Sequence, residues 1–277
     1  MSIASPSPRL LPALSRRGIT GLSVLSGFFV VAFLLAPNAL ARTSVNTENV
    51  ARVFRGGFVT YWRSGDSRFT GDLDGAVTYW FHYHLVKAAV SVLLLLSLGL
   101  LSAVLWNAFR RSGGRVRAAS ATGTGLLALV ALVAAMANVQ GAAAPFASLL
   151  PMLTSGSPRG ELAATLAQVQ QRLHDDPGAY GRTSQPLDAM VSQFAVYHAV
   201  LAALAAAVAL AFLAASVPAW RTLRRSAPAD RRVRRMAAWL GGSSVVLAFT
   251  FAVLVFANAK NALDSTGALT AFFGGPW

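Results

Sequence analysis

The sequence predicts an all-α integral membrane protein with about five transmembrane helices. Of its 277 residues, 55% are hydrophobic and only 12% are charged, whereas about a quarter of the residues of a soluble domain carry charge. The mean hydropathy is +0.54. Apolar stretches of membrane-spanning length recur along the chain, and the arginines collect between them. These observations favour the lipid bilayer as the surroundings of the chain.

A membrane-spanning helix needs about 20 predominantly apolar residues, and five segments meet this requirement. They cover residues 19–41, 80–109, 119–139, 194–220 and 236–259, and none contains Asp or Glu. Lys87 is the one full charge near the interior of a span, in the second segment. The chain therefore consists of a basic amino-terminal segment, residues 1–18, and a single transmembrane domain, residues 19–277. Two long outer loops, residues 42–79 and 140–193, lie within this domain.

The arginines predict the orientation, because positively charged loops stay in the cytoplasm. They precede the first span and fill the connections between the second and third and between the fourth and fifth spans: Arg9, Arg16, Arg17, Arg110, Arg111, Arg115, Arg117, Arg221, Arg224, Arg225, Arg231, Arg232, Arg234 and Arg235. We expect a bacterial cytoplasmic membrane protein with its amino terminus inside and its carboxyl terminus outside. Anionic lipid head groups suit these arginines. Nucleic acid is not an expected partner, because a basic face with stacking aromatics is missing from the pattern.

The first span also has features of a secretory signal. Basic residues and an apolar run lead to Ala39-Leu40-Ala41, which fits an A-x-A cleavage site. Cleavage would leave four spans. The apolar run of about 19 residues exceeds the 7–15 residues of a typical signal core, so we expect this span to be retained.

An internal repeat gives each span a counterpart. Residues 68–84 align without a gap with residues 182–198, and both follow the pattern R-x-[ST]-x-x-L-D-x-x-V-[ST]-x-[WF]-x-x-Y-H. The alignment continues through the span and places Trp106 on Trp220. The odd-numbered spans each end in Asn, at Asn38, Asn138 and Asn258. We therefore predict two and a half parallel copies of a two-helix unit.

Two further patterns concern local structure. A stretch that stops at glycine follows each of these asparagines, ending at Gly56-Gly57, at Gly156 and at Gly274-Gly275, and we expect each to be a short interfacial helix. The fourth span carries alanines at a spacing of four, which permit close helix contact and favour this span as the bundle centre. They are Ala199, Ala203, Ala207 and Ala211.

The repeat predicts a ring of polar residues at the outer face. His84 and His198 enter the membrane at equivalent depths, and the spans ending at Asn138 and Asn258 leave it at about that level. Asp74 and Asp188 lie ten residues before each His, about 15 Å along a helix. The complete ring consists of Asp74, His82, Tyr83, His84, Lys87, Asn138, Asp188, Tyr197, His198, Asn258 and Lys260.

Three interpretations of this ring remain open. In the first, Tyr and His anchor the interface and Asp and Asn cap helix ends. In the second, His82, His84 and His198 hold haem or a divalent metal. In the third, the ring lines a pocket for a lipid, a quinone or an envelope metabolite.

Missing motifs narrow the function. The sequence has no Walker A motif, no G-x-S-x-G and no H-E-x-x-H, and no span carries the midplane acid that coupled carriers usually keep. We favour a non-enzymatic membrane protein that binds or scaffolds a partner or a lipid-like ligand at its extracytoplasmic face. The alternative is a membrane-embedded enzyme or redox protein that uses His84 and His198. The unpaired fifth helix leaves a half-unit that a membrane-protein partner or a second copy of the chain could complete.

Overall fold

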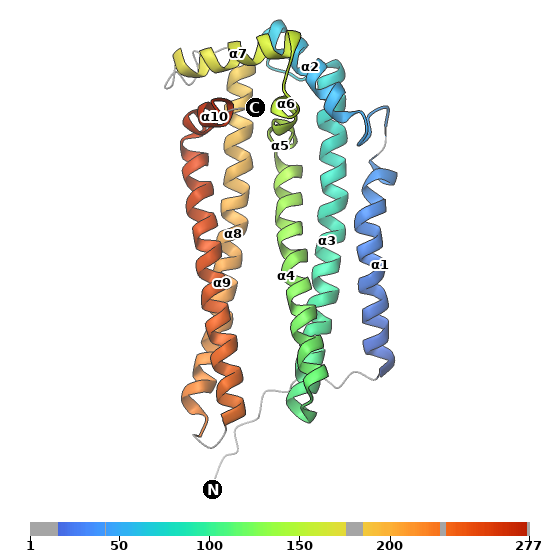
Figure 1. Cartoon of the computed structure of the whole chain (residues 1–277), viewed down its shortest axis with the longest axis vertical. Coiled ribbons are helices and arrows are strands. Elements are labelled where there is room, and N and C mark those ends of the chain that lie inside the picture. The colour runs from blue at the N-terminus through green and yellow to red at the C-terminus, as the bar shows by residue number, and fades with distance from the viewer. Residues whose placement is uncertain (1–15, 42, 176–184, 228–230, 276–277) are drawn as a thin grey trace. The chain divides into compact units, whose positions relative to one another are not determined.

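The computed structural model describes residues 16–41, 43–175, 185–227 and 231–275, which form ten helices and no strand. Five helices are long and apolar enough to cross a membrane, so the expected all-α, multi-pass class is confirmed. They are α1 (Arg16–Leu40), α3 (Gly71–Ser112), α4 (Arg115–Ala143), α8 (Gln185–Arg225) and α9 (Arg231–Leu263) (Figure 1). Most of the basic amino-terminal segment, residues 1–15, and the start of the second repeat motif, residues 182–184, lie outside the described residues.

Four of the five long helices continue beyond both ends of the predicted span, whereas α1 begins earlier than predicted and ends at Leu40. The helix α3 exceeds its prediction clearly. Its 42 residues rise by about 60 Å, twice the hydrocarbon thickness of about 30 Å. The first turns bury Leu73, Ala76 and Tyr79 at the i, i+3 spacing of one helix face. The helix therefore extends past the apolar segment because these residues at its amino-terminal end are buried in a hydrophobic core.

The chain forms two compact units. The first combines residues 1–42 with 82–138, and the second combines residues 43–81 with 139–277. The first unit thus holds α1 and most of α3 and α4. The second holds the start of α3, the end of α4, α8, α9 and the shorter helices.

In the first unit, α3 and α4 form an antiparallel hairpin. Gly113 and Gly114 connect them at φ 70° and 98°, a left-handed backbone that glycine adopts without strain. Leu98 packs on Ala128 and Ala131, and the Ser102 hydroxyl donates to the Ala121 carbonyl oxygen at 3.0 Å. Small residues on α4 let the two backbones approach closely.

In the second unit, α8 and α9 form the other long hairpin (Figure 1). Phe212 stacks on Phe251 with ring centroids 5.9 Å apart, and the indole of Trp220 lies against Gly241. Ala205 and Ala209 are the buried alanines of α8. The expected ridge at Ala199, Ala203, Ala207 and Ala211 is instead exposed, so the prediction that it makes the close helix contact is wrong: the large rings at Phe212 and Trp220 fix the packed face of α8.

Five shorter helices of the second unit form what we call the cap. They are α2 (Val50–Ser64), α5 (Pro145–Leu149), α6 (Pro151–Thr154), α7 (Gly160–Asp175) and α10 (Ser265–Phe273). An aromatic cluster fills the cap: Phe69 stacks on Phe146 at 4.7 Å, and Phe54 and Phe58 are fully buried beside them. The two segments expected to be outer loops therefore fold around a hydrophobic core.

The expected helices that stop at glycine are confirmed in two cases out of three. The helix α6 ends just before Gly156, and α10 ends at Gly274. By contrast, α2 runs through Gly56 and Gly57 and ends at Gly65, whose φ is 71°. The reason is a close approach: a Cβ on Gly57 would lie 2.5 Å from the backbone nitrogen of Leu73, so this glycine serves packing between α2 and α3.

Candidate functional site

A histidine–asparagine pair joins the two helices of the first hairpin at the end away from Gly113 and Gly114. The His84 Nδ1 atom on α3 lies 2.9 Å from Asn138 Oδ1 on α4, and Asn138 is only 7% exposed. The Asn138 Nδ2 group donates to the Ala134 carbonyl oxygen at 2.7 Å. Because the amide nitrogen is used in this way, the amide oxygen faces His84, and His84 Nδ1 is the donor.

The second hairpin has the same geometry at the end where α8 begins. His198 Nδ1 on α8 lies 2.8 Å from Asn258 Oδ1 on α9, and Asn258 Nδ2 donates to the Leu254 carbonyl oxygen at 2.9 Å. Asn258 is 8% exposed. In both hairpins the pair satisfies a buried Asn and a half-buried His and ties the two helices of the hairpin together. We call these two pairs the clasps.

Aromatic rings flank each clasp. Tyr83 meets the His84 ring edge to face at 5.8 Å, and Tyr197 meets the His198 ring in the same way at 5.4 Å. Phe194 also lies against His198, with ring centroids 4.5 Å apart. The tyrosines therefore fix the imidazole planes.

Lys87 belongs to the surroundings of the first clasp. Its Nζ atom lies 4.5 Å from the centroid of the Phe33 ring on α1 and 5.0 Å from that of Tyr83. These are cation–π contacts, which stabilise an ammonium where water is scarce. Residues 1–42 and 82–138 contain no Asp or Glu, so the unit that holds Lys87 supplies no carboxylate to it.

The aspartates of the expected ring occupy helix starts. Asp74 is exposed in the first turn of α3, and Asp188 is half-buried in the first turn of α8. Asp188 and His198 are separated by ten residues of continuous helix, about 15 Å of rise, so α8 itself does not bring them together. A carboxylate in a first turn interacts favourably with the helix dipole, which accounts for both positions.

The remaining ring residues are exposed. His82 and Lys260 lie on the surfaces of α3 and α9. Within the described residues, no three His, Asp or Glu side chains gather as ligands of a metal ion. The first unit thus brings together Tyr83, His84, Lys87 and Asn138, and the second Tyr197, His198 and Asn258.

Two polar residues outside the expected ring also hold the second unit together. Gln140, 4% exposed, donates through Nε2 to the Tyr197 carbonyl oxygen at 3.1 Å. Trp80 donates through Nε1 to the Ser148 hydroxyl at 2.8 Å. The signal for Gln140 was its position two residues after Asn138, where an amide continues the polar end of an apolar helix.

No protein family, no curated protein and no solved structure matches this chain.

Proposed function

We propose that this chain is a multi-pass protein of the bacterial cytoplasmic membrane that binds or scaffolds a partner or a lipid-like ligand at its extracytoplasmic face, without catalysis. One observation carries the proposal. The connections at the arginine-rich helix ends are short, such as Gly113-Gly114 between α3 and α4, whereas the connections at the clasp ends fold into the cap. Helices in a bundle need only about 2–8 residues to connect, so the cap is a surface beyond what connection requires.

The proposed orientation puts the amino terminus inside and the carboxyl terminus outside. It is supported by the arginines of the second hairpin, because Arg224 and Arg225 end α8 and Arg234 and Arg235 begin α9. Arg234 Nη1 donates to the carbonyl oxygens of Leu223 and Ser226 at 3.1 and 3.2 Å. A guanidinium there complements the carboxyl end of α8, and exposed arginines such as Arg224 and Arg225 suit anionic lipid head groups.

We also propose that the chain contains two and a half parallel copies of one two-helix unit, in which α1 pairs with α3, α4 pairs with α8, and α9 opens a third copy. The hairpins α3–α4 and α8–α9 then join equivalent helices of successive copies. The matching clasps support this. The residues at which each hairpin packs correspond as well. When His84 is aligned with His198, Leu98 is aligned with Phe212. When Asn138 is aligned with Asn258, Ala131 is aligned with Phe251. Leu98 packs on Ala131 in one hairpin, and Phe212 packs on Phe251 in the other.

The cap offers a defined surface for a partner, either another membrane protein or a second copy of the chain. On α7, Thr165, Leu166, Val169 and Leu173 are buried at helical spacing, which leaves a polar face outward. Photo-crosslinking residues at exposed Arg52 and His174 of the cap should give discrete adducts in native membranes. The same residue at Phe256, 74% exposed on an apolar helix, is the control. Equal adduct patterns from all three positions would overturn a role for the cap.

A haem or metal protein is the competing proposal, and purified protein tests it directly. We expect no Soret band and no stoichiometric metal in the detergent-purified full chain, and His84→Ala and His198→Ala should lower only the melting temperature. His82→Ala, at an exposed position, is the matched control. A Soret band or bound metal that both variants lose would replace the scaffold with a redox or metal enzyme.

A further inference from the structure

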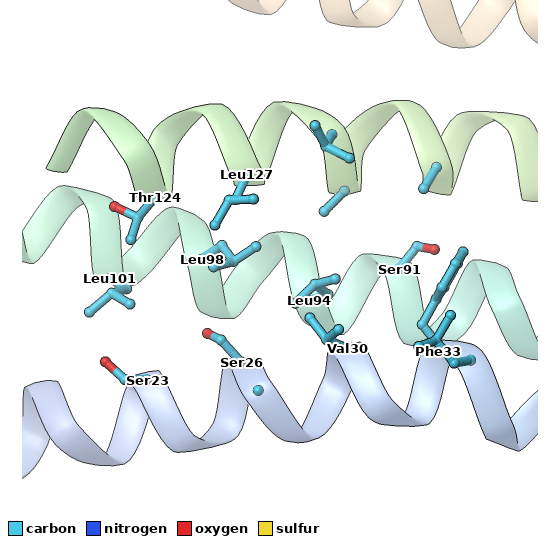
Figure 2. A pocket seen from close by; sticks show the side chains of 15 residues that line it. Ser23, Ser26, Val30, Phe33, Ser91, Leu94, Leu98, Leu101, Thr124 and Leu127 are labelled. Atoms are coloured by element: carbon cyan, nitrogen blue, oxygen red, sulfur yellow. The ribbon is translucent and has the colours of Figure 1, made fainter. Parts of the chain in front are cut away.

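The first unit contains a groove lined by α1, α3 and α4, with a volume of about 530 Å³. Figure 2 shows its side chains, with Ser26 and Val30 of α1 facing Leu94 and Leu98 of α3, and Leu127 on α4. The volume lies within the usual range of small-molecule pockets, about 300–1,000 Å³. The lining covers residues 23–34, 91–101 and 124–134, so each helix contributes about 15 Å of length.

The groove is chemically a hydrocarbon surface although four hydroxyls line it. Each of these hydroxyls donates to a carbonyl oxygen of its own helix: Ser23 to Ile19 at 3.0 Å, Ser26 to Leu22 at 2.9 Å, Ser91 to Lys87 at 2.7 Å and Thr124 to Ser120 at 2.9 Å. A polar metabolite would lose its hydrogen bonds to water on entering and find no donor in exchange. A flexible hydrocarbon chain makes no hydrogen bonds to water, so it would lose none on entering the groove.

The groove is open along one side. Val30 and Leu34 on α1 are 48% and 63% exposed, and Leu127 and Val130 on α4 are 55% and 66% exposed. Such an exposed apolar surface suits the hydrocarbon of a bilayer better than water. A chain can therefore enter sideways from the membrane and remain attached to a head group at the interface.

A cation stands at the outer end of the groove. Phe33 and Ser91 are lining residues at this end, and Lys87 lies one turn further out on α3 with its Nζ atom over the Phe33 ring. An ammonium near the membrane core is costly unless an anion or water stabilises it, and neither 1–42 nor 82–138 contains a carboxylate. Among the described residues no carboxylate forms an ion pair with Lys87, so the first unit presents a positive charge where a hydrocarbon groove meets the interface.

We propose that this groove binds one anionic phospholipid, with an acyl chain along α1, α3 and α4 and its phosphate at the Lys87 ammonium. The charge selects the phosphate, and the absence of a carboxylate from the unit disfavours an ethanolamine head group. The second acyl chain remains in the bilayer through the open side. This proposal deepens the lipid-like ligand of the proposed function and rests on the membrane placement made there.

Native mass spectrometry of the full chain, titrated with phosphatidylglycerol or phosphatidylcholine in detergent, tests the proposal. We expect one tightly held phosphatidylglycerol per chain and weaker binding of phosphatidylcholine. Lys87→Gln should lower the affinity for phosphatidylglycerol about fivefold. Lys260→Gln, at the other lysine of the chain, should leave the affinity unchanged.

A second pair of variants tests the groove itself. A Cβ on Gly27 meets nothing within 4 Å, and Gly27 lines the groove, so Gly27→Leu should fill it and displace both lipids without disturbing the fold. Gly21→Leu is the control on the same helix, because a Cβ on Gly21 also meets nothing within 4 Å.

Equal retention of both lipids by the wild type, or unchanged phosphatidylglycerol binding in Lys87→Gln or Gly27→Leu, would overturn the proposal. Displacement of the phospholipid by an equimolar polyprenyl phosphate would overturn the choice of occupant. Crosslinking from the cap is measured separately, so loss of lipid binding alone leaves the scaffolding proposal standing.

Discussion

His198 Nδ1 lies 2.8 Å from Asn258 Oδ1, and this bond joins α8 to α9 near the start of α8 and the end of α9. A hydrogen bond between buried side chains of adjacent membrane helices contributes about 0.6 kcal/mol on average and up to about 1.7 kcal/mol. The clasp therefore fixes the register of the hairpin more than it stabilises the fold.

A double-mutant cycle measures this contribution. His198→Ala and Asn258→Ala should each lower the free energy of unfolding, and the double variant should lose less than the sum of the two, with a coupling of about 1 kcal/mol. The cycle for His84 and Asn138 should give a coupling of similar size. Additive losses in reversible unfolding in mixed micelles would contradict both clasps.

The two adjacent glycines of α2 should respond in opposite directions to the same change. Gly57→Ala places a Cβ 2.5 Å from the Leu73 backbone nitrogen and should destabilise the cap by about 1–3 kcal/mol. Gly56→Ala meets nothing within 4 Å and should stabilise the helix by about 0.5–1 kcal/mol. Limited proteolysis of the cap and melting temperatures report the difference, and equal effects would contradict the packing of α2 on α3.

Cysteine labelling tests the orientation, and the absence of native cysteine removes any background. Ala164→Cys lies at an exposed position of α7, and Ser112→Cys lies at an exposed position where α3 ends. In intact cells, a membrane-impermeant maleimide should label position 164 and leave position 112 unlabelled until the cells are permeabilised. The reverse pattern would invert the proposed topology.

Tyr61 makes the stability of the cap sensitive to high pH. Burial, with a smaller contribution from the charge of Asp66, raises the pKa of Tyr61 from 10.0 to about 12. The folded state thus favours the neutral phenol, so this contribution is fully present below pH 10 and is lost as the pH rises through 12.

The free energy of unfolding of the wild type should therefore fall between pH 10 and 12, and in Tyr61→Phe this fall should be smaller by up to about 2 kcal/mol. At neutral pH the substitution should change stability by less than about 1 kcal/mol, because the buried Tyr61 hydroxyl has no hydrogen-bond partner among the described residues. Melting curves of both proteins at pH 8 and pH 11 make the comparison. Parallel alkaline losses would show that Tyr61 does not titrate in this way.

The sequence predicted the long helices because each apolar run reaches the length of about 20 residues that a membrane span needs, and hydropathy alone reports that. It also placed His84 beside Asn138 in depth, since the repeat fixes how far each residue lies from the end of its span. The partner of each histidine could not be predicted, because depth alone does not say which helices are neighbours.

The cap was predicted least well. The α7 helix carries its buried residues at positions 165, 166, 169 and 173, a helical spacing that the sequence contains, but the surrounding polar residues resemble a loop. The prediction of a close helix contact at the alanine ridge of α8 failed for a related reason. Small residues permit close contact, yet the contact is made where large rings and a glycine fit together, as at Trp220 and Gly241.

The clasps also bear on how the protein is made. The first hairpin is closed at one end by Gly113 and Gly114 and at the other by His84 and Asn138. All of these residues have left the ribosome before α8 is synthesised, so α3 and α4 can reach their final register as a pair during synthesis. Membrane insertion can then proceed by successive finished hairpins, and a late helix has no need to rearrange an early one.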